Sequence, residues 1–205
     1  MKIYEFRAFP NPLRARMAAA EKGLTDRIEF VQVNVPNGEH KLPEFLQLNP
    51  VGKVPVLVLD DDTAIAECTA ITEYLDHSAG TPVLTGETPK QRAQIHMLQR
   101  RAEALVLDAI SDYFHHATAG LGKLEPIQIK EWGEYQRQVA IKGMHYFDGV
   151  LRGQHYLLGE HLTMPDITLF AGLKLIDFMQ IGVPDTCKHL LGWRERVGQR
   201  PSAAA

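Results

Sequence analysis

A hydroxyl and an imidazole stand four residues apart at Ser111 and His115, in a segment that we expect to be helical. That spacing puts both side chains on one face of the helix, whereas His116 points about 100° away. A water held between them could bond to an anion or take a proton, because the unperturbed pKa of histidine, about 6.5, lies near neutral pH. A solvated polar stripe, or a histidine bonded to a neighbouring carbonyl, is the alternative.

A second group of residues has the parts of a site for a small anionic peptide. Val54-Pro55 stands before the apolar run Val56-Leu57-Val58-Leu59. Because Pro55 cannot donate to a sheet ladder, we expect it at the first position of a strand, where a cis bond is possible. Such a bond would leave the amide and carbonyl of Val54 free to pair with an extended ligand backbone.

Glu67 and Cys68 stand where a helix should begin, after the strand that completes a hairpin. The first turn of a helix leaves its amides unpaired, and these amides favour a carboxylate ligand. A plain hairpin capped by a helix is the alternative here.

The elements that must position these residues follow from the periodicity of the chain. We expect strands at 2–6 and 28–33, a hairpin at 56–66, and helices at 12–22 and 68–79. Gly, Pro and Thr indicate a linker before long helical segments at 90–117, 126–151, 163–179 and 190–199. The sequence therefore predicts a thioredoxin-like α/β domain over 1–80, a linker over 81–89 and an all-helical C-terminal domain over 90–205.

Composition narrows the class of protein. The chain has 205 residues, of which 45% are hydrophobic and 23% charged, as in ordinary globular proteins. Its net charge of -3 argues against nucleic acid, and we expect no membrane span and no signal peptide, hence a cytoplasmic protein. Its two cysteines lie far apart with no metal-ligand spacing, so we expect neither a disulfide framework nor a metal site.

The motif Val54-Pro55 with Glu67-Cys68-Thr69-Ala70-Ile71 resembles the glutathione-binding signature of the glutathione transferase superfamily, in which Ser usually stands at the position of Cys68. Leu162-Thr163-Met164-Pro165-Asp166-Ile167 resembles the capping box and hydrophobic staple of the second domain of that superfamily. The similarity runs from Lys2 to about Pro201 and implies the glutathione transferase fold, with glutathione as co-substrate.

Most members of the superfamily activate the thiol with a Tyr, Ser or Cys just after the first strand. Here that position falls on Phe9 or Pro10, which cannot donate a hydrogen bond to sulfur, and Tyr4 lies earlier in the strand. Asn11-Pro12 predicts a helix start with Asn11 as the N-cap. The unpaired amides of the first turn of that helix could lower the thiol pKa. Capping alone is the alternative for Asn11.

The segments around Phe9-Pro10-Asn11, His40 and Ser111 also resemble an atypical fungal and bacterial branch that lacks the usual side chain. Members of that branch are thought to use a water held by a helix Ser and His, which here implies Ser111 and His115. His40 and Lys53 are candidates for pairing with the glycine carboxylate of glutathione. Arg100, Arg101 and Glu103 could instead face a second subunit in a homodimer.

The sequence thus predicts a glutathione S-transferase that joins the thiolate to a small hydrophobic electrophile. Phe9, Tyr113, Phe114 and the last helices would line the pocket for that electrophile. Two other interpretations remain: a glutathione-dependent peroxidase or thiol reductase, which would need a reactive Cys near the first helix, and a non-catalytic glutathione-binding or regulatory protein on the same fold.

Overall fold

A four-stranded mixed sheet organises the N-terminal part of the chain. A computed structural model describes all residues from 1 to 205. The strands are β1 (Lys2–Glu5), β2 (Glu29–Gln32), β3 (Val56–Val58) and β4 (Ala64–Ala66), in the order β2-β1-β3-β4. β1 pairs parallel with β2 and antiparallel with β3, and β3 forms the predicted hairpin with β4.

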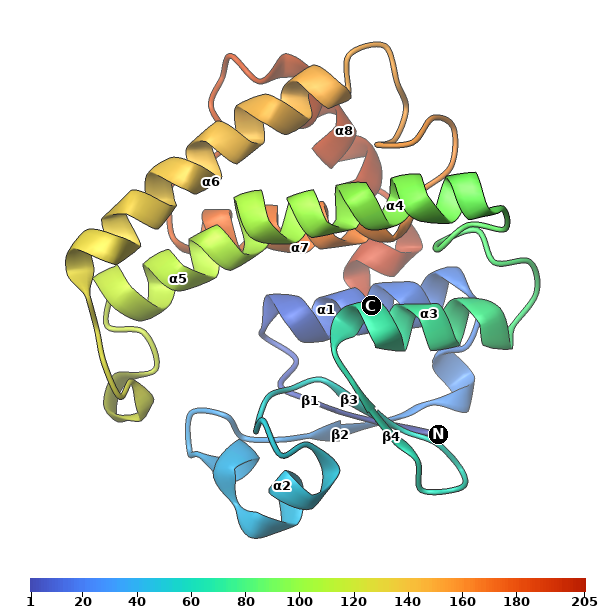
Figure 1. Cartoon of the computed structure of the whole chain (residues 1–205), viewed down its shortest axis with the longest axis vertical. Helices are drawn as coiled ribbons and strands as arrows, with labels where there is room; N and C mark the ends of the chain where they lie inside the picture. Colours follow the sequence, from blue (N-terminus) through green and yellow to red (C-terminus); the bar gives the residue numbers. More distant parts are fainter.

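Helices cover both faces of this sheet. α1 (Pro10–Glu21) and α3 (Cys68–Ser78) lie together on one face, and the short α2 (Pro43–Leu48) lies on the other (Figure 1). Single turns at Thr25–Arg27 and Glu39–Lys41 complete the connections. The order of strands and helices is that of the predicted thioredoxin-like unit.

The second half of the chain is helical. Its long helices are α4 (Pro89–Ala102), α5 (Asp108–Ala117), α6 (Lys130–Val150), α7 (Met164–Phe178) and α8 (Lys188–Gly198), with short turns at Gly122–Leu124 and Pro201–Ala204. α4 and α5 form one rod that the sequence predicts as a single helix, and α6 returns antiparallel to α5 (Figure 1). Thus the predicted fold class is confirmed, whereas the domain limits at 81–89 remain a proposal.

A π-helical turn at Glu103–Leu107 joins α4 to α5 and was not predicted. α6 approaches this turn so closely that a Cβ atom on Gly143 would lie 2.2 Å from the carbonyl oxygen of Leu105. A Cβ atom on Gly172 of α7 would lie 3.0 Å from Cγ1 of Val106. The turn is therefore held between two helices that approach it through glycines.

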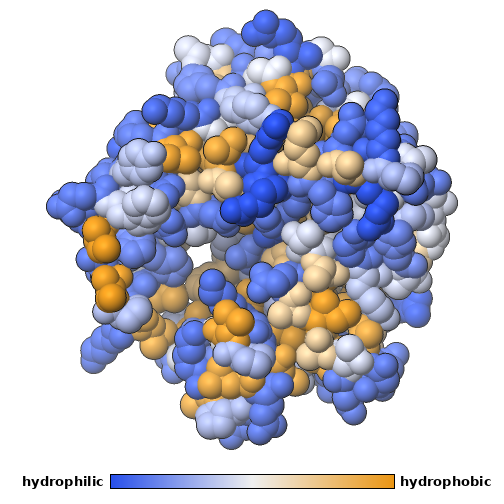
Figure 2. All heavy atoms as spheres, viewed as in Figure 1, coloured by the Kyte–Doolittle hydropathy of each residue, from blue (hydrophilic) through white to orange (hydrophobic).

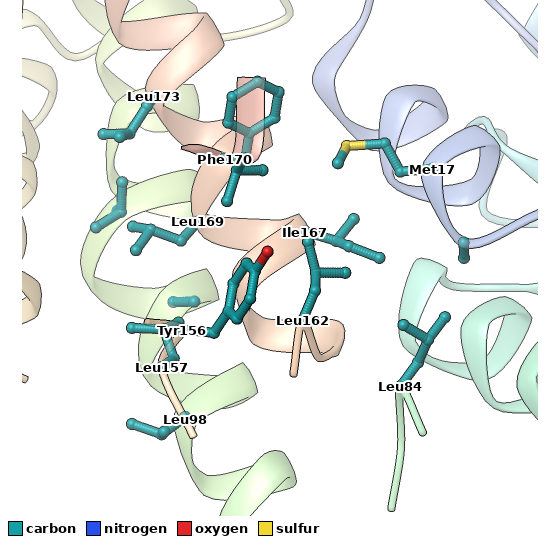
Figure 3. Close-up of a cluster of buried hydrophobic side chains, with 14 of the residues drawn as sticks. Met17, Leu84, Leu98, Tyr156, Leu157, Leu162, Ile167, Leu169, Phe170 and Leu173 are labelled. Atoms are coloured by element: carbon teal, nitrogen blue, oxygen red, sulfur yellow. The ribbon is translucent and has the colours of Figure 1, made fainter. Parts of the chain in front are cut away.

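The main hydrophobic core runs through both groups of elements. Figure 3 shows Met17 of α1, Leu84 of the segment between α3 and α4, and Ile167 of α7 facing one region of buried side chains. α7 begins with the predicted capping box, in which the Asp166 carboxylate accepts from the amide and the hydroxyl of Thr163 at 2.9 and 2.8 Å. Leu162 and Ile167 are both buried beside it, as the predicted staple requires. The capping box fixes where α7 starts.

Candidate functional site: two adjoining cavities

Two cavities meet between the sheet unit and the helical unit. One is about 450 Å³ and mostly apolar, and the other is about 240 Å³ and mostly polar. Asn11 and Val54 line both cavities, so a ligand in one could reach the other. The space-filling view shows an opening between the upper and lower parts of the molecule (Figure 2).

The walls differ in chemistry. The polar cavity is lined by Asn11, Arg14, Asn49, Lys53, Val54, Pro55, Glu67, Cys68, Thr69, Arg100, Glu103 and Asp108. The apolar cavity is lined by Phe6, Arg7, Ala8, Phe9, Pro10, Asn11, Leu13, Arg16, Val54, Ser111, Phe114, His115, Lys174, Leu175 and Phe178. Of the predicted pocket residues, Tyr113 is absent from the wall and lies under the guanidinium of Arg137 instead. Tyr4 packs on the other side of the sheet.

The start of α1 corrects the predicted cap. The helix begins at Pro10 with Phe9 as its N-cap, so Asn11 lies inside the first turn and its side chain accepts from Arg14 at 3.0 Å. Pro10 and Pro12 have no N–H, and the Leu13 amide already donates to the Phe9 carbonyl at 3.3 Å. Only the Asn11 amide is left free. The helix starts two residues earlier than the Asn11 cap predicts, since Pro10 is as well suited to the first helical position as Pro12.

The loop before β3 leaves the backbone of Val54 unpaired, as the sequence predicts. The Val54-Pro55 peptide bond is cis, and neither the amide nor the carbonyl of Val54 has a hydrogen-bond partner in the chain. Asn49 supports this loop, since its side chain donates to the Lys53 carbonyl at 2.8 Å. Lys53 is exposed at the wall of the polar cavity, with no carboxylate partner.

The start of α3 provides three free amides. Glu67 is the N-cap, with a left-handed φ of 69°, and the Ile71 amide donates to its carbonyl at 2.9 Å. The amides of Cys68, Thr69 and Ala70 have no partner in the chain. The buried Cys68 thiol donates to the Asn11 carbonyl at 3.3 Å, and burial raises its pKa. Cys68 is therefore protonated at neutral pH.

An ion pair that the sequence did not predict joins α1 to the π turn. Arg14 is buried, and its Nη2 donates to Glu103 Oε1 at 2.8 Å. Gln99 and Thr69 also donate to that oxygen, at 2.9 and 3.1 Å. Of the residues considered for a subunit contact, Glu103 and Arg100 face the polar cavity, whereas Arg101 donates to the Tyr146 hydroxyl within the chain.

Ser111 and His115 line the apolar cavity together, on the same face of α5, as predicted. The Ser111 hydroxyl donates to the Leu107 carbonyl at 2.7 Å and keeps its lone pairs for another donor. His115 Nδ1 lies 2.7 Å from Oε1 of Glu125, and its Nε2 has no partner in the chain. Sequence reasoning missed Glu125, which enters from the loop between α5 and α6.

His40 does not have the predicted charge. It is buried and absent from the wall of the polar cavity, and burial lowers its pKa below the ordinary value of 6.5. A neutral imidazole cannot act as the cation for a carboxylate. Of the two candidates, only Lys53 is both charged and placed at the cavity.

Comparisons with known proteins identify the family of the chain. Residues 10–78 match the family model described as glutathione S-transferase, N-terminal domain, and residues 112–205 match the one described as glutathione S-transferase, C-terminal domain. The chain is 53% identical over 203 residues to glutathione S-transferase 2 of Saccharomyces cerevisiae, covering 98% of this chain and 87% of that protein.

Solved structures have the same fold. The crystal structure of Gtt2 from Saccharomyces cerevisiae matches with a TM-score of 0.97 and 52% identity, over 100% of this chain and 99% of that one. A glutathione S-transferase domain-containing protein from Marinobacter aquaeolei matches with a TM-score of 0.96 and 50% identity, over 98% and 99%. No helix of the chain is long and apolar enough to cross a membrane.

Proposed function

The chain belongs to the glutathione S-transferase family and is a glutathione transferase, and from this premise we propose how it works. Glutathione occupies the polar cavity, with its sulfur at the border marked by Asn11 and Val54. A small electrophile occupies the apolar cavity next to it. The observation that carries this proposal is that these two residues line both cavities, so the two substrates meet there.

Four groups in the polar cavity match the parts of glutathione. The free amides at the start of α3 favour one carboxylate, and the ammonium of Lys53 pairs with the other. The unpaired amide and carbonyl of Val54 bond to the backbone of the cysteinyl unit between them. The Glu67 carboxylate is available for the ammonium group of the peptide. Cys68 contributes to the wall of the cavity.

Thiol activation then depends on α5 more than on α1. The start of α1 offers a single free amide at Asn11, which limits its contribution to thiolate stabilisation. Ser111 and His115 hold a water in the apolar cavity that bonds to the sulfur. Because the Glu125 carboxylate only accepts, His115 Nδ1 carries the hydrogen and Nε2 is left to accept from that water.

The reaction needs no covalent intermediate on the enzyme. The thiol proton passes through the water to His115 and from there to solvent. The sulfur lone pair forms the new S–C bond, and the leaving group departs with the electron pair of the bond that breaks. Phe9, Phe114 and Phe178 exclude water from the apolar body of the electrophile.

Cysteine chemistry is disfavoured in this site. A peroxidase or thiol reductase needs an accessible thiolate, and burial raises the pKa of Cys68. Cys187 is also buried, and the pKa of its thiol is raised by burial and by Asp148. We therefore place the reactive sulfur on glutathione.

We also propose that the chain forms a homodimer. Val51 and Met97 are exposed apolar side chains, and they lie close in sequence to Lys53 and Arg100 at the rim of the polar cavity. Burial against a second copy would remove this apolar surface from water and close the rim. Light scattering on the wild type and on Val51→Asp would measure the oligomeric state. The cytoplasmic location and the absence of a metal remain predictions from the sequence.

The test is the ultraviolet absorbance of the thiolate as pH is varied, with glutathione saturating the wild type. A midpoint well below ~8.5, the pKa of a free thiol, supports the activating site, and each unit requires about 1.4 kcal/mol of preferential stabilisation of the thiolate. An unshifted midpoint with measurable binding would overturn it. Ser111→Ala and His115→Ala should each move the midpoint back toward that of free glutathione.

A further inference from the structure

The charges on the wall of the apolar cavity have one sign. Arg7, Arg16 and Lys174 line it, and none of its lining residues is Asp or Glu. The whole chain carries a net charge of -3, so this positive wall is contrary to the overall balance. A neutral hydrocarbon would gain no ion pair from these cations, and it would separate them from water on binding.

The charge of Arg16 is already compensated. Its guanidinium pairs with the fully buried Glu5, and it also donates to the backbone carbonyls of Arg7 and Ala205 at 2.9 Å. This cation therefore holds β1, α1 and the end of the chain together. It is not free to bind a ligand.

Arg7 and Lys174 are not compensated. Both side chains are exposed, and neither has a carboxylate within 4.0 Å. Arg7 follows β1, and Lys174 comes from α7, so the two residues line the cavity from different units of the fold. Lys174 Nζ lies 5.7 Å from the centre of the Phe170 ring, where its charge is still open to solvent.

We propose that the electrophile is amphipathic and anionic: an apolar body bearing a carboxylate that pairs with Arg7 and Lys174. The inference rests on the proposed function and names its substrate class. Phe9, Phe114 and Phe178 contact the apolar body, while the two cations receive the carboxylate. The reacting carbon faces the border with the polar cavity, and the carboxylate takes no part in bond formation.

The same cations could act on the glutathione thiolate instead, and a pair of electrophiles separates the two roles. A chloronitrobenzoate and its methyl ester react at the same carbon, with loss of chloride, but only the first is an anion. The readout is the ratio of their kcat/KM values, compared between wild type and variant so that intrinsic reactivity cancels. The variants are Arg7→Gln and Lys174→Gln, with Lys142→Gln as a control on an exposed lysine of α6 outside the cavity.

We expect each cavity variant to lower the benzoate-to-ester ratio roughly threefold to fivefold, as partly exposed ion pairs do, and the control to leave it unchanged. Added salt should lower the ratio in the wild type more than in the double variant, which combines Arg7→Gln with Lys174→Gln. If the benzoate-to-ester ratio stays the same in the cavity variants, because both substrates react more slowly by the same factor or neither does, the inference is overturned.

Failure of the proposed function has a different signature. In that case the absorbance midpoint of bound glutathione is unshifted and neither electrophile is converted. Calorimetric binding of the unreactive nitrobenzoate and its methyl ester then tests the anion preference alone. Tighter binding of the benzoate that is lost in the double variant supports the inference, and equal binding of the two contradicts it.

Discussion

His115 Nδ1 lies 2.7 Å from Oε1 of Glu125, across the loop that joins α5 to α6. The carboxylate is only 8% exposed and also accepts from the Leu121 amide at 2.7 Å. Gly120 has a left-handed φ of 53°, and a Cβ atom there would lie 2.4 Å from the same oxygen. The loop therefore encloses the carboxylate and holds one tautomer of the histidine, with Nε2 unprotonated in the neutral ring.

Replacing Glu125 should disturb this tautomer without removing the imidazole. In Glu125→Gln the side-chain amide can either accept from or donate to Nδ1, so the imidazole becomes a mixture of tautomers. We expect turnover to fall about tenfold, less than the ~10² or more typical of losing a general base. Nitrogen NMR of the histidine ring reports the tautomer directly. Glu131→Gln, in the first turn of α6, is the matched control. An unchanged tautomer with unchanged turnover would exclude a positioning role.

Ser111 and His115 should act as one unit if they hold one water. Ser111→Ala and His115→Ala are each expected to cut turnover by about 10² or more, and the double variant should cost little more than either single one. Glutathione affinity should change little, because neither side chain lines the polar cavity. His116→Ala is the control, since that side chain is absent from both cavities. Losses that multiply in the double variant would mean independent roles.

Features that depend on neighbouring residues could be read from the sequence. The strand start at Val54-Pro55, the helix start at Glu67-Cys68 and the capping box of Thr163 and Asp166 each lie within a few residues. Local sterics and capping decide such features, so their residue types are informative by themselves.

Features that depend on tertiary packing could not be read in this way. Arg14 and Glu103 are 89 residues apart in the chain, and no local pattern connects them. The helical period continues through Glu103–Leu107, so it gives no sign of the π turn. His40 lies in a polar stretch that predicts exposure, but the fold buries it. Each of these needed the packed structure.

The buried His40 should make stability depend on pH. Its pKa in the folded state is lowered by burial and by Lys41, so the folded protein resists protonation that the unfolded chain accepts. Stability is therefore full above about 6.5 and is lost as pH falls through the lowered value. His40→Gln should flatten this part of the profile. Urea unfolding at pH 8 and pH 5.5, at one protein concentration, measures the difference. If His40→Gln loses as much stability between pH 8 and pH 5.5 as the wild type does, other groups cause the loss of stability.

The contact between α6 and the π turn can be tested with two glycines of the same helix. A Cβ on Gly143 would meet the backbone of Leu105 at 2.2 Å, whereas a Cβ on Gly149 would meet nothing within 4 Å. We expect Gly143→Ala to lower the free energy of unfolding by about 1–3 kcal/mol or more, since backbone must move. Gly149→Ala should raise it by up to ~1 kcal/mol through helix propensity.

The two alanine variants should also differ in activity, because the π turn sets the rotation of α5 and thus the direction of Ser111 and His115. Turnover should fall in Gly143→Ala at temperatures well below its unfolding transition, and stay at the wild-type value in Gly149→Ala. Thermal unfolding and turnover measured on the same samples separate instability from misplacement. A stable and fully active Gly143→Ala would mean that α6 can move away from the turn without changing α5.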